Sequence, residues 1–193
     1  KNLKPVREGE EINEVKLKDF LLEKGLITRV NIELKVKQFT NGYSNLTYLL
    51  QIEDKEYVLR RPPFAAPKRG HDMGREFKVL QHLNPVYSKS PKVYVFNEGP
   101  KIIGAPFYIM EKVDGEILSA KSAFSMQVSP EQFKTISDTW VNAFVEFHNI
   151  DYKAAGLSEL GRPEGYVERQ VHNWGKQYLA AVTDEVPAAQ KVM

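Results

Sequence analysis

One stretch decides the fold: Gln38-Phe39-Thr40-Asn41-Gly42-Tyr43-Ser44-Asn45-Leu46-Thr47-Tyr48-Leu49-Leu50, followed by Tyr57-Val58-Leu59-Arg60. The pattern is typical of a strand, a small polar turn, a second strand, a short turn and a third strand that ends in a cation. The polar turn offers backbone N–H groups and hydroxyls, and the cation supplies a fixed positive charge beneath it. The stretch therefore predicts a binding site for nucleotide phosphates.

The bulk composition limits what the chain can be. With 193 residues, 42% hydrophobic content and 11 prolines, it predicts a globular protein of one domain or two small lobes. The net charge of +2 gives no basic surface for nucleic acid, and no apolar run has transmembrane length. The lack of cysteine excludes disulfides, Cys-based zinc sites and thiol nucleophiles. We expect a cytoplasmic protein that binds neither nucleic acid nor membrane.

Hydrophobic periodicity separates a strand-rich first half from a helical second half. Alternating or short apolar runs predict five strands, at Val30–Thr40, Tyr48–Ile52, Tyr57–Leu59, Pro91–Asn97 and Phe107–Lys112. Apolar spacings of three and four predict helices, at Lys18–Lys24, Asp72–Leu83, Pro130–His148 and Gly165–Val182. We expect a mainly antiparallel five-stranded sheet with one helix against it, then a linker near Glu111–Asp114 and a helical lobe.

A cation and a carboxylate follow the polar turn in the order that phosphate binding requires. Arg60 ends the third strand, and Glu76 lies beside Phe77, near the apolar face of the predicted helix Asp72–Leu83. A carboxylate in that place can aim the cation at the phosphates. The alternative is that both are solvated surface charges, as most charged residues are. The order of turn, cation, helix, Glu and strand pair favours the phosphate site.

Six segments resemble the aminoglycoside phosphotransferase and choline kinase family, more narrowly its kinase-like domains found alone in bacteria or fused to acyl-CoA dehydrogenases. The segments are Phe39–Tyr48 (FTNGYSNLTY), Tyr57–Pro62 (YVLRRP), Arg75–Leu80 (REFKVL), Gly104–Gly115 (GAPFYIMEKVDG), Phe147–Leu157 (FHNIDYKAAGL) and Tyr166–Tyr178 (YVERQVHNWGKQY). Each is modest alone, but together and in this order they are specific. The resemblance as a whole extends over nearly the whole chain from about Asn31 onward.

The resemblance implies a fold, cofactors and site residues. The fold is α+β and protein kinase-like, with a nucleotide-binding lobe at residues 1–110, and a linker plus the first helices of an incomplete C-terminal lobe at 111–193. The cofactors of the complete protein would be ATP and Mg²⁺. The nucleotide site would consist of Gly42, Ser44 and Asn45 in the loop, Arg60 with its helix partner Glu76, Met110, and the linker residues Glu111, Lys112 and Val113, whose backbone would meet adenine. For Met110 the alternative is ordinary core packing.

The resemblance also indicates what the chain lacks. The family has a His-Gly-Asp…Asn loop and a later metal-binding Asp, and neither occurs here, so we expect no catalytic residue and no metal ligand in this chain. The segment most similar to that loop is His148-Asn149-Ile150-Asp151. Its spacing is wrong for the loop and suits the end of a helix. A mixed group, Arg169, His172, Trp174 and Lys176, could touch an acceptor or form a solvated helix face with one packed Trp.

Two functions from different classes remain open at this point. The first is an ATP-dependent small-molecule phosphotransferase, present here as its N-terminal portion, whose acceptor is a hydroxylated metabolite or antibiotic. The second is a catalytically inactive nucleotide-binding or scaffold module. A His-Gly-Asp…Asn sequence beyond Met193 would favour the enzyme, and a stop codon there would favour the module. A protein kinase is disfavoured, because the loop lacks three glycines and Arg60 stands where such kinases keep Lys.

Overall fold

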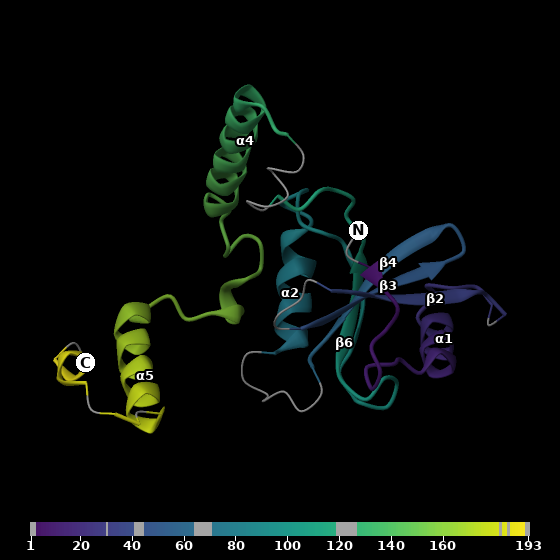
Figure 1. Ribbon diagram of the computed structural model, residues 1–193, viewed down its shortest axis with the longest axis horizontal. Helices are drawn as coiled ribbons and strands as arrows, with labels where there is room; N and C mark the ends of the chain where they lie inside the picture. Colours follow the sequence, from purple (N-terminus) through teal and green to yellow (C-terminus); the bar gives the residue numbers. More distant parts are fainter. Residues whose placement is uncertain are drawn as a thin grey trace. The chain divides into compact units, whose positions relative to one another are not determined.

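The structure is a computed structural model that describes residues 3–29, 31–40, 45–63, 71–118, 127–181, 183–184 and 186–191. The chain forms two compact units, Lys1–Asp151 and Tyr152–Met193. The described residues of the first contain the sheet and three helices (Figure 1), and those of the second contain the short η1 (Ser158–Leu160), α5 (Tyr166–Ala181) and α6 (Pro187–Gln190). The predicted lobe boundary at residue 110 falls inside the first unit and stays a prediction.

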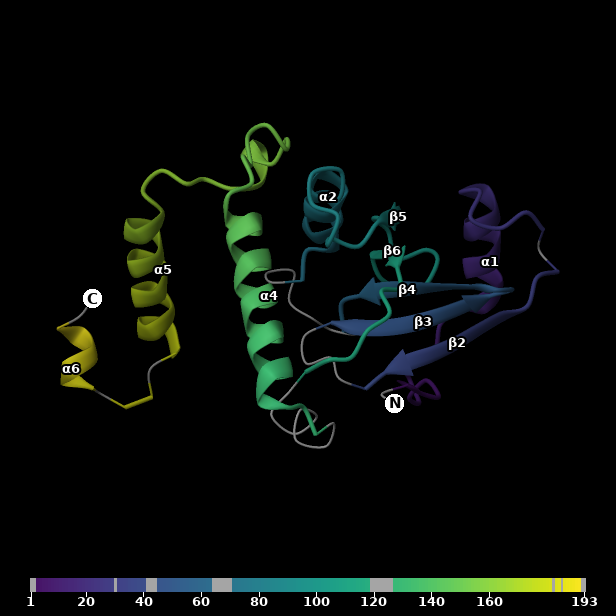
Figure 2. The same ribbon diagram turned by 90° about the horizontal axis from the view of Figure 1, so that it is seen from above.

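A six-stranded antiparallel sheet forms the centre of the first unit (Figure 2). Its strand order is β1-β2-β3-β4-β6-β5. The strands are β1 (Leu3–Lys4), β2 (Leu34–Phe39), β3 (Leu46–Ile52), β4 (Lys55–Arg61), β5 (Val93–Asn97) and β6 (Phe107–Glu111). The prediction of five strands was wrong by one edge strand, because two residues of β1 are too few to show any period in the sequence.

The hairpin between β3 and β4 fixes which residues share a face of the sheet. Ile52 pairs with Lys55, so only Glu53 and Asp54 connect the strands, and the register runs on to pair Thr47 with Arg60. Glu53 adopts a positive φ of 52°, which such a tight connection requires. Lys55 begins β4. Because side chains alternate along a strand, Arg60 and Arg61 lie on opposite faces.

One face of the sheet packs against α1 (Glu14–Glu23), which is longer than the predicted helix Lys18–Lys24. Leu17, Phe20 and Leu21 of this helix are buried in a continuous apolar core with sheet residues. Phe20 meets Phe107 of β6 edge to face, with ring centroids 5.3 Å apart. The sheet side of this core consists of Leu34, Leu46, Tyr48, Leu50, Ile52, Tyr57, Leu59, Val95, Phe107 and Ile109. This face provides most of the unit's apolar burial, which is the main favourable term in folding.

The other face packs against α2 (Met73–Leu83), as the sequence predicted. Asp72 caps the helix by accepting a hydrogen bond from the backbone N–H of Arg75 at 2.9 Å. Phe77 contacts the rings of Phe96 on β5 and Tyr108 on β6. These ring contacts hold α2 against β5 and β6 and so fix where the carboxylate of Glu76 lies over the sheet.

A third described helix of the first unit, α4 (Pro130–His148), begins and ends where the sequence predicted. Ser129 and Gln132 form a reciprocal capping box at its start. Tyr87 joins α4 to the segment after α2, because its hydroxyl donates to the carbonyl of Ala143 at 3.2 Å and its ring contacts Phe147. Among the helices in the described part of the chain, none has the length and apolar character needed to cross a bilayer.

Candidate functional site: an arginine–glutamate pair over the sheet

Arg60 and Glu76 meet on the α2 face of the sheet, as the sequence predicted. The guanidinium Nη2 of Arg60 lies 3.4 Å from Oε2 of Glu76, and each side chain is about one third exposed. Arg60 reaches this place because it is the penultimate residue of β4, on the same face as buried Val58 and opposite Tyr108 in the register with β6. The two residues therefore form a partly exposed ion pair, and their role in binding phosphates stays a prediction.

Two further donors hold the carboxylate of Glu76. The hydroxyl of Tyr108 donates to Oε2 at 3.0 Å, and the side-chain amide of Asn45 donates to Oε1 at 2.9 Å. Burial raises the pKa of Tyr108 well above its ordinary value, so the hydroxyl keeps its proton and remains a donor at neutral pH. Sequence reasoning missed Tyr108, because only the pairing of β4 with β6 brings it beside Arg60.

The side chain of Asn45 is engaged within the protein. It is buried, with 7% of its surface exposed, and its carbonyl oxygen lies 2.8 Å from Nδ1 of His71. The amide therefore joins the end of the loop to α2 and to the residue before that helix's cap. Gly42 and Ser44, the other predicted loop residues, lie outside the described residues.

One N–H donor of the Arg60 guanidinium has no hydrogen-bond partner among the described residues. This donor is the buried Nε, whereas Nη2 is engaged by Glu76. A buried N–H without a partner is unfavourable by about 1–3 kcal/mol, so such groups in native proteins call for a structural or functional explanation. An anionic ligand beside Arg60 would supply the missing acceptor.

The predicted linker follows directly from β6. Met110 is half-buried and pairs in register with Val58, on the same face as Arg60. The backbone N–H of Glu111 donates to the carbonyl of Lys92 at 2.7 Å, so this group is already used within the sheet. Val113 is exposed. An adenine ring at the linker would have to meet the other backbone groups of Glu111 and Val113.

Lys112 ties the linker to the sheet. Its ammonium lies 2.6 Å from the carboxylate of Glu56 on β4 and also pairs with Asp114. This contact, with a second hydrogen bond from Gln51, holds the pKa of Glu56 below its usual range. The side chain of Lys112 therefore positions the linker backbone and is not directed at a ligand.

Comparison with known proteins identifies the family. A model of the phosphotransferase enzyme family (APH) matches residues 35–193. The chain belongs to this family. Strands β3 to β6, α2, the Arg60–Glu76 pair and the linker all lie within the matched range.

Relatives of this chain carry the same domain within longer proteins. The mouse acyl-CoA dehydrogenase family member 10 is 32% identical over 194 residues, which cover 100% of this chain and 18% of the mouse protein. The rat acyl-CoA dehydrogenase family member 11 is 37% identical over 161 residues, which cover 82% of this chain and 20% of the rat protein. The chain thus spans about a fifth of the length of the curated relatives it matches.

A solved structure confirms the predicted fold class. A Ralstonia eutropha protein classed with the aminoglycoside phosphotransferases superposes on this chain with a TM-score of 0.72 and 31% sequence identity. The match covers 92% of this chain and 50% of that one. The chain therefore has the kinase-like α+β fold, with an antiparallel sheet and helices.

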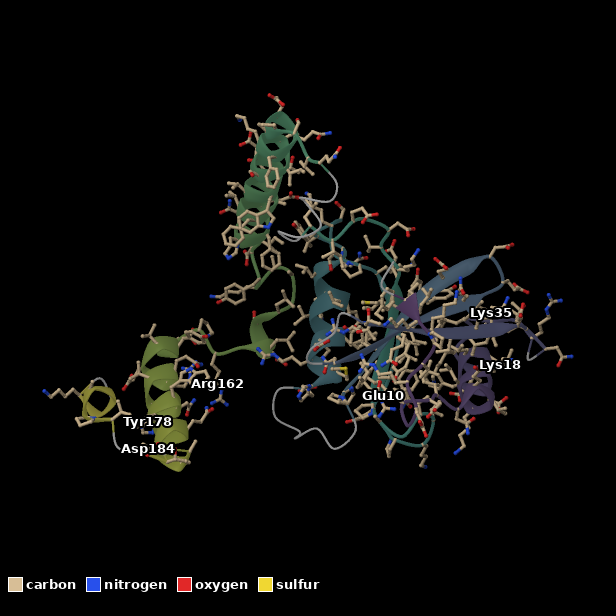
Figure 3. All side chains as sticks on the ribbon, viewed as in Figure 1. Glu10, Lys18, Lys35, Arg162, Tyr178 and Asp184 are labelled. Atoms are coloured by element: carbon tan, nitrogen blue, oxygen red, sulfur yellow. The ribbon has the colours of Figure 1, made fainter. Side chains whose placement is uncertain are left out.

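Arg61, the neighbour of Arg60, has a purely internal role on the α1 face. It is 1% exposed, and it donates to the carbonyl of Ile103 at 2.9 Å. Nearby, the hydroxyl of Tyr48 donates to the backbone carbonyl of Glu10 at 2.9 Å, and burial raises the pKa of Tyr48 to about 12. Glu10 lies beside the densely packed side chains of the sheet and α1 (Figure 3). These groups stabilise the first unit and do not face the site.

The remaining candidates fall into structural roles. His148 ends α4 and its Nδ1 hydrogen-bonds the carbonyl of Phe144 at 2.9 Å, as expected for a helix end. In the second unit, Arg169 donates to the carbonyls of Arg162 and Glu164. The expectation of a packed Trp174 was wrong, because its ring is 65% exposed. The described residues contain no cluster of three His, Asp or Glu side chains that could hold a metal.

Proposed function

We propose that the chain is the nucleotide-binding part of an ATP-dependent small-molecule phosphotransferase. The observation that carries the proposal is the Arg60–Glu76 pair, in which the carboxylate orients the guanidinium and a buried Nε is left without an acceptor. Nucleotide phosphates are the ligands that such an oriented cation suits, because phosphoryl transfer depends on positioning and on neutralising charge. Membership of the phosphotransferase enzyme family supports the same reading.

The described residues fit ATP better than they fit Mg²⁺. Arg60 would hold the phosphates, and Val58 and Met110 on the same face would meet the adenine ring next to the linker. No acidic cluster for the metal occurs among the described residues, so we derive no step that involves Mg²⁺. When bound, the nucleotide supplies the phosphoryl group, and this chain's residues bind and orient its phosphates.

The acceptor that we propose is a hydroxyl group of a small metabolite or antibiotic. Relatives named acyl-CoA dehydrogenases contain this domain, which makes a hydroxyacyl thioester as plausible an acceptor as an aminoglycoside. We propose a cytoplasmic location, since ATP is the donor and the sequence contains no cysteine. An inactive module that only binds nucleotide is the second candidate.

The test is isothermal titration of the full-length protein with Mg-ATP, followed by assays of ADP release with hydroxylated acceptors. We expect saturable binding that Arg60→Ala weakens by about tenfold or more, the usual worth of a charged hydrogen bond. Arg29→Ala is the matched control, because Arg29 is exposed and pairs only with Glu53 at the hairpin end among the contacts of the described residues. No saturable binding would overturn the proposal, and binding without turnover on any acceptor would support the inactive module.

A further inference from the structure

The side chain of Asn45 is buried and hydrogen-bonded within the protein, unlike that of a surface loop residue or of a residue that contacts phosphate. Asn45 is the last residue of the predicted loop and directly precedes β3, and only 7% of its surface is exposed. Its Nδ2 lies 2.9 Å from Oε1 of Glu76, and its Oδ1 lies 2.8 Å from Nδ1 of His71. Both ends of the amide are therefore engaged within the protein.

The chemistry of the partners fixes the orientation of this amide. A carboxylate can only accept hydrogen bonds, so the NH₂ group of Asn45 must face Glu76. The carbonyl oxygen then faces His71, whose Nδ1 must carry a proton to donate to it. The orientation of the amide thus follows from the donor and acceptor chemistry of Asn45, Glu76 and His71.

Glu76 collects its three contacts from separate elements of the lobe. Asn45, just before β3, contacts one carboxylate oxygen, and Tyr108 of β6 and Arg60 of β4 contact the other. A side chain held at both oxygens loses its rotational freedom, and its charge then has a fixed place over the sheet. Removing the Asn45 donor leaves Oε1 without a partner among the contacts described, so the carboxylate can turn away from Arg60.

We propose that Asn45 is a positioning residue of the nucleotide site: its amide fixes the carboxylate of Glu76, which in turn fixes Arg60 for the phosphates. The inference rests on the proposed function. It assigns Asn45 a role other than the direct nucleotide contact that the sequence predicted. It also links the loop to α2, so that a shift of either would move the charge that meets the phosphates.

The experiment compares Mg-ATP with adenosine as titrants of the full-length protein. Asn45→Asp keeps the size of the side chain but replaces the donor to Glu76 with a like charge. We expect Asn45→Asp to weaken Mg-ATP binding by about tenfold while adenosine binding changes by less than about twofold, since adenosine lacks the phosphates. Asn97→Asp is the matched control, because Asn97 bonds only the nearby carbonyl of Gly99 among the contacts of the described residues.

A double variant separates positioning from direct contact. If Asn45 acts through Glu76, Asn45→Ala combined with Glu76→Gln weakens Mg-ATP binding no more than the stronger single change does. Losses that multiply would overturn the proposal, because they would indicate that Asn45 meets the phosphates itself. An equal loss of adenosine affinity in Asn45→Asp would also overturn it, because that loss would indicate general damage to the lobe.

A measurement of stability without ligand tests the contact between Asn45 and Glu76 independently of the proposed function. Asn45→Asp combined with Glu76→Gln exchanges donor and acceptor, so the hydrogen bond between the two positions can form again. We expect the unfolding midpoint of this double variant to recover toward the wild-type value relative to Asn45→Asp alone. Failure to recover would overturn the contact on which the proposal depends. Absence of Mg-ATP binding by the wild type would overturn the proposed function instead, even with the midpoint recovered.

Discussion

The guanidinium of Arg60 lies 3.4 Å from the carboxylate of Glu76, and both side chains remain about one third exposed. An ion pair of this exposure adds at most about 1 kcal/mol to stability, because water screens it and two long side chains must be ordered. The surrounding donors, Tyr108 and Asn45, nevertheless hold Glu76 in one place. Because these contacts orient the pair but stabilise the protein little, they fit a ligand site better than a structural role.

The first prediction concerns the planar fork of Arg60. Arg60→Lys keeps the charge but loses bidentate geometry, so we expect a partial loss of about 1–2 kcal/mol in transition-state stabilisation in the full-length enzyme. Arg60→Ala should lose more. Because Glu76→Gln acts through the same contact, its effect should not add to that of Arg60→Ala. Values of kcat/KM for the two single variants and the double variant measure this coupling.

Additive effects in that cycle would contradict the assigned roles of Arg60 and Glu76, and so would silent variants of an active enzyme. Arg29→Ala serves again as the control for general loss of positive charge, since Arg29 is exposed at the hairpin end.

The strands could be predicted from the sequence because their signals are local, whereas the pairing of Arg60 with Glu76 was expected from the order of the motifs and from the resemblance. The alternation in β2 and the hairpin of β3 and β4 set the register, and that register alone puts Arg60 on one face and Arg61 on the other. The sequence shows two adjacent arginines with similar neighbours. Pairing of Arg60 with Tyr108 on β6 is the tertiary fact that distinguishes the site residue from the core residue.

The hydrogen bonds of Asn45 and Tyr108 to Glu76 could not be predicted from the sequence, because they depend on where α2 lies over the sheet. No local pattern relates Asn45 or Tyr108 to Glu76, since these residues come from three different elements. The resemblance placed Asn45 in the loop, but only its contacts with His71 and Glu76 indicate its role. The two-residue strand β1 was missed for the related reason that it forms only through its pairing with β2.

The second prediction concerns the hydroxyl of Tyr108. Tyr108→Phe removes one donor to Glu76 and leaves the ring packed against Phe77. We expect a loss of about 1 kcal/mol in unfolding free energy, the net worth of one hydrogen bond, and a several-fold weaker affinity for Mg-ATP. Urea unfolding and titration measure the two effects. Unchanged nucleotide affinity at full protein stability would show that Tyr108 does not help to orient the pair.

The third prediction is a loss of stability at alkaline pH through Tyr48. Its pKa is raised by burial to about 12 from the ordinary 10.0, so the folded protein holds this proton at a pH at which the unfolded chain releases it. The stability from this group is therefore complete below pH 10 and is lost as the pH rises toward about 12, by about 1.4 kcal/mol per pH unit at most.

Tyr48→Phe lacks this titration, and it also loses the hydrogen bond to the carbonyl of Glu10. We expect the variant to be less stable than the wild type at pH 7 by about 1 kcal/mol, and to lose stability less steeply above pH 10. Urea unfolding between pH 7 and pH 11 gives both quantities. Tyr166→Phe is the control at an exposed ring. Parallel pH profiles for wild type and Tyr48→Phe would contradict the prediction.

The last prediction concerns the exposed apolar surface of α4. Large apolar side chains remain exposed along this helix, namely Phe133, Trp140, Val141, Phe144, Val145 and Phe147. Trp140 and Phe144 stack on each other with ring centroids 5.4 Å apart. Exposed apolar surface of this extent favours association, so we expect the 193-residue chain by itself to self-associate as its concentration rises. Sedimentation velocity over a range of concentrations measures the effect.

Replacing Trp140 and Phe144 by Gln should reduce that association with little change in the unfolding midpoint, since both rings are exposed and Gln is a good helix former. Ser137→Gln, at an exposed polar position of the same helix, is the control and should leave association unchanged. A chain that stays monomeric at every concentration would contradict the prediction. A lowered midpoint in the double variant would instead show that the two rings help to stabilise the first unit, which their exposure argues against.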